Sequence, residues 1–178
     1  TRGDVTLASA STEGYLVPDL LEADLRIVFC GTAPSRASAA ARAYYAKPGN
    51  RFWPTLHEVG ITPQRLAPQQ YRQLLDLGIG LTDLCKVHSG VDAELPAGAF
   101  DLDAFRRKVR HYRPRIIAFT SKNAAQSFLG QAVDYGLQPG ALFGSRLFVL
   151  TSPSGLATRF FDVNVWKDLA VLARVEGA

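Results

Sequence analysis

The chain has 178 residues, a formal net charge of +4 and 47% hydrophobic residues. This length and balance indicate one globular domain with a sizeable core, and the basic charge favours an anionic partner such as nucleic acid. The two cysteines, Cys30 and Cys85, exclude a four-thiolate iron–sulfur cluster held by one chain. No apolar run of the sequence is long enough to span a membrane and no signal-peptide pattern appears, so we expect a cytoplasmic protein.

The predicted elements begin after a lead-in. Residues 1–24 mix Ser, Thr, Gly, Pro and acidic residues without a clear period, so we expect them to be loosely ordered, with one short helix at 20–23. Residues 25–178 are expected to form a single domain that opens with the apolar strand 25–30.

Strand and helix patterns alternate through the rest of the chain. Further strands are predicted at 79–84, 115–120 and 146–151, and helices at 38–45, 50–59, 63–77 (with a break at Pro68), 101–112, 122–129 and 164–175. This alternation predicts a three-layer α/β/α fold with a mainly parallel central sheet of about four strands.

Polar loops follow three of the predicted strands. They read GTAPS at 31–35, TDLCK at 82–86 and TSPSGLATR at 151–159. Parallel strands end at the same edge of a sheet, where ligands of open α/β sheets bind, so we expect the active site there. GTAPS alone is a poor phosphate loop, because it lacks the Walker lysine and the glycines of GxGxxG.

Three motifs taken together are more specific. VFCGTAPS, KPGNRFW and SPSGL occur in this order, and the chain from residue 25 to the last helix resembles the mismatch-specific uracil-DNA glycosylases. These are bacterial relatives of thymine-DNA glycosylase within the uracil-DNA glycosylase superfamily. The resemblance implies an enzyme that flips uracil, notably from G·U mismatches, out of duplex DNA and hydrolyses its N-glycosidic bond. We expect double-stranded DNA containing uracil or a mismatch as partner, no metal or other cofactor, no membrane, and a monomer.

The resemblance also implies roles for residues. Gly31, Thr32, Ala33 and Tyr45 correspond to the base pocket, where Tyr45 stacks on the base and the backbone N–H groups of Thr32 and Tyr45 donate to its carbonyl oxygens. Alternatively, Tyr45 is a core residue.

The last motif corresponds to the segment that enters the duplex. Leu156 is the implied wedge, Gly155 permits close backbone approach, and Ser152, Ser154 and Arg159 are placed for contacts with phosphates or the widowed base. Alternatively, Leu156 packs inwards and Arg159 is a solvated surface charge.

The chain departs from the family at the residue that matters most for catalysis. Ala33 stands where the family has the asparagine that positions the attacking water, and Ser152 stands where its last motif has asparagine. We predict that Asp83 at the end of the second strand replaces the lost function, because a carboxylate stabilises an oxocarbenium-like sugar and accepts a proton from water. The alternative is that Asp83 caps a turn or pairs with Lys86. Lesser candidates are His57, His88 and Asn123.

Three functions therefore remain open. The first is a monofunctional glycosylase, since no lysine stands at a position assigned to Schiff-base chemistry. The second is a catalytically weak or inactive lesion-binding protein of the same fold, and the third an unrelated enzyme that uses GTAPS for phosphate. The basic residues Arg36, Lys47, Arg51 and Lys86 flank the polar loops and are expected to contact DNA phosphates.

Overall fold

The central sheet has five strands. The structure is a computed structural model that describes residues 12 and 14–176. The strands are β1 (Ile27–Gly31), β2 (Ile79–Asp83), β3 (Ile116–Phe119), β4 (Gly136–Leu142) and β5 (Ser145–Val149). Their order is β2-β1-β3-β5-β4, and all neighbours are parallel except β4 and β5. The sheet thus has β1 and β3 at its centre.

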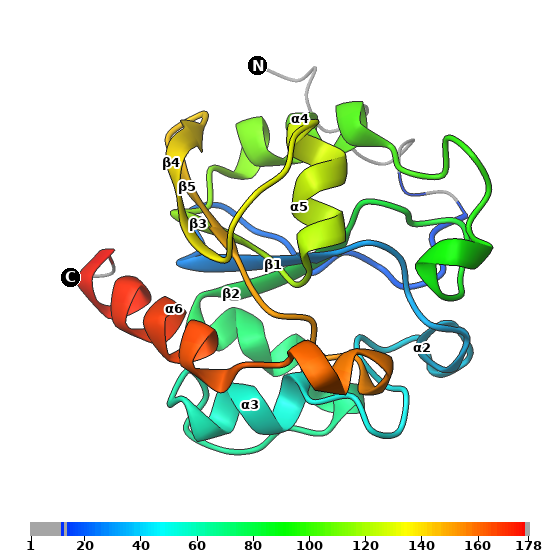
Figure 1. Ribbon diagram of the computed structural model, residues 1–178. Helices are drawn as coiled ribbons and strands as arrows, with labels where there is room; N and C mark the ends of the chain where they lie inside the picture. The colour runs from blue at the N-terminus through cyan, green and yellow to red at the C-terminus, as the bar shows by residue number, and fades with distance from the viewer. Residues whose placement is uncertain (1–11, 13, 177–178) are drawn as a thin grey trace, which may run out of the picture.

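Helices cover both faces of the sheet, as Figure 1 shows. The α-helices are α2 (Arg36–Ala41), α3 (Phe52–Glu58), α4 (Leu102–Tyr112), α5 (Lys122–Leu129) and α6 (Val163–Glu176). Three 3₁₀ helices join them: η1 (Pro68–Leu77), η2 (Asp92–Glu94) and η3 (Gly155–Phe160). Side-chain oxygens of Ser35, Asp101 and Ser121 accept hydrogen bonds from the first turns of α2, α4 and α5, which explains where these three helices begin.

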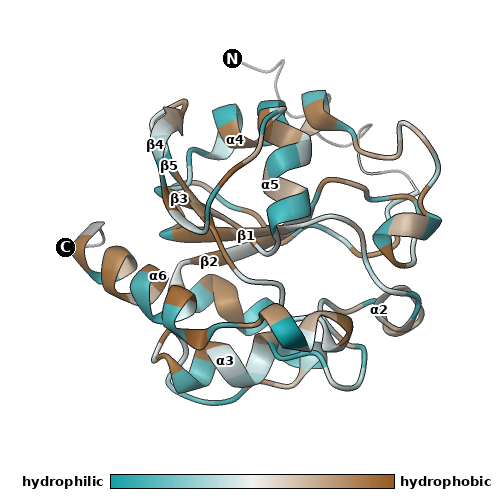
Figure 2. Cartoon of the chain, viewed as in Figure 1, coloured by the Kyte–Doolittle hydropathy of each residue, from teal (hydrophilic) through white to brown (hydrophobic). Residues whose placement is uncertain are grey.

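Two apolar cores lie between the sheet and its helices, and Figure 2 shows largely hydrophobic strands β1, β3 and β5 between helices that carry both hydrophobic and hydrophilic residues. Successive strand residues point to opposite faces. Phe29 therefore packs with Phe52 of α3 and Trp166 of α6, whereas Phe119 packs with Phe105 of α4 on the other face. Burial on both faces accounts for the continuous apolar sequence of β1.

The three-layer fold with a mainly parallel sheet is confirmed. The four expected strands and all six expected helical segments are present, with bounds shifted by a few residues; the helix expected at 63–77 is the 3₁₀ helix η1, which starts at Pro68. The sequence prediction missed β4, because this edge strand contains glycine and proline and no alternating apolar pattern.

The lead-in differs from expectation over the residues that the structure describes. Leu20 does not begin a helix: its N–H and C=O pair with Leu81, so the segment covers the outer edge of β2. Val17 and Leu20 are buried in the core. Gly80 permits this approach, because a Cβ atom there would lie 2.5 Å from the Leu20 carbonyl oxygen. The remainder of the predicted loose segment, residues 1–11 and 13, lies outside the described residues.

The strand order predicts where a ligand binds. From β1 the chain crosses to β2 on one side and then to β3 on the other, so the sheet has a switch point between β1 and β3. The carboxyl ends of these three strands carry Gly31, Asp83 and Thr120. Within the described part of the chain, no helix has both the length and the apolar character needed to cross a membrane.

Candidate active site

A cavity of about 380 Å³ opens at the carboxyl ends of β1, β2 and β3. Its walls come from the turn after β1, the 44–50 segment, the loop at 90–92, the start of α5 and the segment after β5. The sequence-predicted residues that line it are Gly31, Thr32, Ala33, Tyr45, Asp83, Ser152, Ser154 and Leu156. The fold therefore brings together at one cavity residues that are more than 120 positions apart in the sequence.

The floor of the cavity is Gly31, with three oxygen atoms converging above it. A Cβ atom on Gly31 would lie 2.7 Å from Asp83 Oδ1, 3.3 Å from the Tyr45 hydroxyl oxygen and 3.4 Å from Thr120 Oγ1. The Tyr45 and Thr120 hydroxyls are hydrogen-bonded to each other at 3.1 Å. A side chain at position 31 would therefore displace the Asp83 carboxylate.

Asp83 is a buried carboxylate, 5% exposed. Burial raises its pKa from 3.8 to about 6, against the nearby Lys86 and Lys108, which lower it, and with Asp19, which raises it further. Its Oδ2 has no hydrogen-bond partner among the described residues, and the Lys86 ammonium lies 3.9 Å away. A buried carboxylate with a pKa near neutrality is suited to accept a proton.

Tyr45 is held in an unusual backbone conformation. Its φ of 53° is in the left-handed region, which bulky residues rarely adopt. The turn is fixed on both sides, because Trp53 Nε1 donates to the Tyr44 carbonyl and the Ala46 N–H donates to Ser38 Oγ. The Tyr45 ring stacks on Phe52 with centroids 4.0 Å apart. Burial, together with Asp83, raises the pKa of Tyr45 well above its usual range, so its hydroxyl remains protonated.

Two residues of the cavity lining, Thr32 and Tyr45, have backbone N–H groups available for a ligand. Among the described residues, no protein group accepts a hydrogen bond from the N–H of Thr32 or of Tyr45.

The loop containing η2 is bound to the turn after β1: Asp92 accepts from the Thr32 hydroxyl at 2.6 Å and from Asn123 Nδ2 at 2.7 Å. This loop forms one wall of the cavity.

The segment after β5 forms a protruding rim. Leu156 is 72% exposed and Phe160 is 68% exposed, both on η3. The base of the segment is rigidly attached, because the Arg51 N–H donates to the Pro153 carbonyl and Trp166 Nε1 donates to the Thr151 carbonyl. The inward-packing alternative for Leu156 is therefore wrong.

Two predicted residues of this segment lie outside the cavity lining. Gly155 approaches the backbone of Gly49, whose carbonyl oxygen would lie 3.4 Å from a Cβ atom at position 155. Arg159 is exposed, with its guanidinium 5.9 Å from the Phe160 ring. Both lie on η3 with Leu156 and Phe160.

The four basic residues that were expected to contact DNA phosphates lie in different surroundings. Lys86 is buried and paired with acids, so its expected contact with DNA phosphate is wrong. Arg36 is exposed and pairs with Glu94, and Lys47 lines the cavity. Arg51 lies over the Phe161 ring at 5.0 Å.

The sequence prediction missed Thr120 and Ser121 as site residues. Thr120 and Ser121 stand at the end of the third strand, just as Thr82 and Asp83 stand at the end of the second. The pattern of polar residues at strand ends could therefore have identified them. His57 and His88 are exposed and do not line the cavity. No group of three or more His, Cys, Asp or Glu residues in the described part of the chain is arranged to hold a metal ion.

Comparison with known proteins identifies related folds. The family model described as the uracil DNA glycosylase superfamily matches residues 18–173. The solution NMR structure of a candidate uracil DNA glycosylase from Methanosarcina acetivorans is similar, with a TM-score of 0.63 and 24% sequence identity. The match covers 91% of this chain and 97% of that chain, so the fold is shared over nearly the full length of both.

Proposed function

The chain belongs to the uracil-DNA glycosylase superfamily, and from this premise we propose that it hydrolyses the N-glycosidic bond of uracil in DNA, notably in G·U mismatches. The observation that carries the proposal is the buried Asp83 carboxylate at the floor of a cavity whose rim bears the exposed Leu156. A base must leave the helix to reach such a carboxylate, and an apolar residue at the rim can fill the gap that it leaves.

In the proposed complex the flipped uracil occupies the cavity beside Tyr45. Phe52 covers one face of the Tyr45 ring, so the other face is the one on which the base stacks. The N–H groups of Thr32 and Tyr45 donate to the carbonyl oxygens of the base. These donors stabilise the negative charge that develops on uracil as it leaves.

Asp83 acts on the sugar and on water. As the bond from C1′ to the base nitrogen breaks, its electron pair goes to the base, and the Asp83 carboxylate stabilises the positive charge on the sugar. Water then bonds to C1′ and gives a proton to Asp83. In this way a carboxylate from β2 takes over the water-positioning role for which Ala33 has no polar side chain.

The rim supplies the contacts with duplex DNA. Leu156 enters the stack at the site of the flipped base, and Phe160 adds a second exposed apolar surface on η3. We expect contacts with the phosphates or the widowed base from Ser152, Ser154, Arg159 and Lys47. We further expect a monomer that acts in the cytoplasm.

Base release from a labelled duplex containing one G·U pair tests the proposal. Wild-type protein should leave an abasic site that breaks only after alkali, since no Schiff-base step is proposed. Asp83→Asn should lower the single-turnover rate by about a hundredfold or more, while Asp168→Asn, which removes an exposed carboxylate on α6, should match the wild type.

Two results would contradict the proposal. Undiminished release by Asp83→Asn would show that Asp83 has no catalytic role. Tight binding without release by the wild type would favour the second candidate, a lesion-binding protein, for which the observation is Ala33 in place of the family asparagine.

A further inference from the structure

A buried group of charges lies behind Asp83, outside the cavity lining. Lys86 is at its centre, with a side chain that is 5% exposed. Its Nζ lies 3.0 Å from Asp19 Oδ1 and 3.9 Å from Asp83 Oδ2, and it donates to the Tyr44 hydroxyl at 2.9 Å. Burying an ammonium group is costly unless it is paired, so Lys86 is held by these partners.

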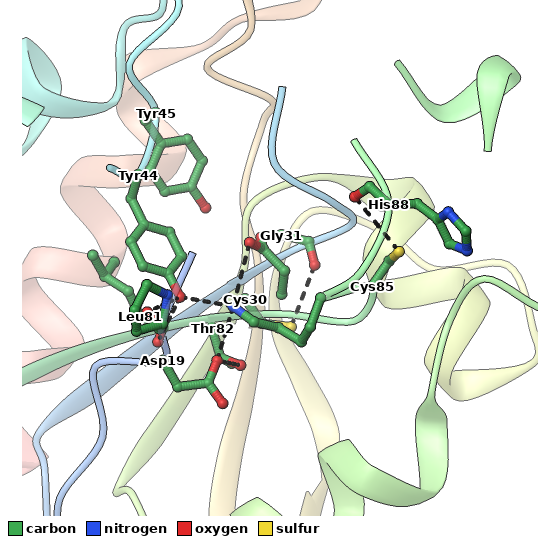
Figure 3. Close-up of polar contacts among 12 residues, drawn as sticks. Asp19, Cys30, Gly31, Tyr44, Tyr45, Leu81, Thr82, Cys85 and His88 are labelled. Carbon is green, nitrogen blue, oxygen red and sulfur yellow. Dashed lines mark hydrogen bonds and ion pairs between the residues drawn. The ribbon is translucent and has the colours of Figure 1, made fainter. Parts of the chain in front are cut away.

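Asp19 anchors this lysine from the lead-in segment. Its Oδ2 lies 2.6 Å from Lys108 Nζ of α4, and its Oδ1 accepts from the Thr82 hydroxyl at 2.7 Å. Figure 3 shows the Asp19 carboxylate beside the side chain of Thr82. Although burial alone would raise the pKa of Asp19, the two lysines and these hydrogen bonds hold it below its usual value. Asp19 is therefore a fixed anion with two cations.

The Asp83 carboxylate has fewer polar partners than the Asp19 carboxylate. Its Oδ2 is buried without a hydrogen-bond partner in the described part of the chain, and Lys86 is the cation with which it forms an ion pair. Lys86 is thus shared between Asp19, which has several other partners, and Asp83, which has few. Because Asp83 is only three residues before Lys86, one short segment carries both groups of the pair.

We propose that Lys86 is a positioning residue for Asp83: its ammonium, held by Asp19 and Tyr44, lies behind Oδ2, directs Oδ1 into the cavity and keeps the carboxylate ionised. The proposal rests on the proposed function of Asp83. Lys86 itself does not line the cavity, so we assign it no contact with the substrate.

The other groups that face Asp83 set the direction of the effect. Asp19 on the lead-in raises the pKa of Asp83, Lys108 on α4 lowers it, and the Gly31 N–H on β1 lowers it through a hydrogen bond. Cys30 on β1 and Tyr44 and Tyr45 after α2 have pKa values raised by burial and are neutral near pH 7. Lys86 makes the largest contribution that favours the ionised form.

The test compares Lys86→Met with Lys108→Met in the full chain. The midpoint of Asp83 ionisation is followed by carbon NMR of its carboxyl group, and the acid limb of base release is measured in parallel. Lys86→Met should raise both midpoints by about 1–3 pH units, the range for an opposite charge at this separation. Lys108→Met removes the same charge from the far side of Asp19 and should shift them less.

Asp19→Asn is a second variant, and it should shift the Asp83 midpoint in the opposite direction. It removes an anion near Asp83 and frees Lys86 from its competing carboxylate, so the Asp83 midpoint should fall. If Lys86→Met does not fold, Lys86→Gln, which keeps a polar side chain without the charge, replaces it in the same measurement. A folded Lys86→Met or Lys86→Gln protein with an unchanged Asp83 midpoint would overturn the positioning role.

The two readouts separate this proposal from the proposed function. A wild-type protein that releases no base would refute the glycosylase proposal, yet the NMR midpoints would still measure whether Lys86 acts on Asp83. Base release that depends on Asp83 with no midpoint change in Lys86→Met would refute the positioning role alone.

Discussion

Asp83→Asn should make the protein more stable at the same time as it removes activity. The folded-state pKa of Asp83 is about 6, above the ordinary value of 3.8. The folded protein therefore binds this proton more tightly than the unfolded chain, and its stability falls as the pH rises from below 3.8 to above 6. Keeping the ionised carboxylate buried costs about 1.6 kcal/mol at pH 5 and about 3 kcal/mol at pH 8.

Urea unfolding at these two pH values measures the effect. An asparagine does not titrate, so the free energy of unfolding of Asp83→Asn relative to wild type should increase by about 1.4 kcal/mol from pH 5 to pH 8. The control is Asp168→Asn, in which an exposed carboxylate on α6 is removed and the difference from wild type should be the same at both pH values. A difference between Asp83→Asn and wild type that does not grow with pH would refute the reasoning.

Four further predictions concern activity. Single-turnover base release should rise with pH through about 6 and then level off, because Asp83 must be ionised; a rate independent of pH between 5 and 8 would contradict this. Gly31→Ala should lower the rate about a hundredfold, since its Cβ atom would lie 2.7 Å from Asp83 Oδ1; an unchanged rate would mean that the carboxylate acts from another position. Ala33→Asn should leave the rate unchanged or raise it in the same assay, and a large loss would contradict the assignment of this turn. Leu156→Ala should weaken binding to a G·U duplex about tenfold, measured by fluorescence anisotropy, with a smaller effect on single-stranded DNA; equal loss on both would argue against a wedge.

Much of this fold could be predicted because its signals are local. Continuous apolar runs predicted the four parallel strands, and the helices predicted from residues 101 and 122 begin where Asp101 and Ser121 cap α4 and α5. β4 was missed because its pairing with β5 depends on a chain reversal and not on its own residues. Leu20 was misassigned for a related reason: its two backbone hydrogen bonds go to Leu81, 61 positions away.

The site was predictable where strand ends and motifs coincide, and not where charges meet across the fold. The position of Asp83 follows from its place at the end of β2 beside Gly31 of β1. The burial of Lys86 does not follow, because its partners Asp19 and Tyr44 come from segments far away in the sequence. From the sequence alone, a basic residue in a polar loop is interpreted as a surface charge. Only the fold shows that two acids, Asp19 and Asp83, lie beside Lys86.

Under the proposed function the catalytic side chain lies on another strand than in the rest of the family, and the parallel sheet accounts for this change. Gly31 and Asp83 are paired in register, so the last residues of β1 and β2 reach the same cavity. In the proposed function, Asp83 of β2 therefore takes the role of the polar group that Ala33 lacks, without a change in the turn after β1. The replacement is not equivalent, because a buried carboxylate, unlike a neutral amide, must be kept ionised. A carboxylate in this position therefore needs a nearby cation, and in this chain the Lys86 ammonium lies behind it, tied to Asp19.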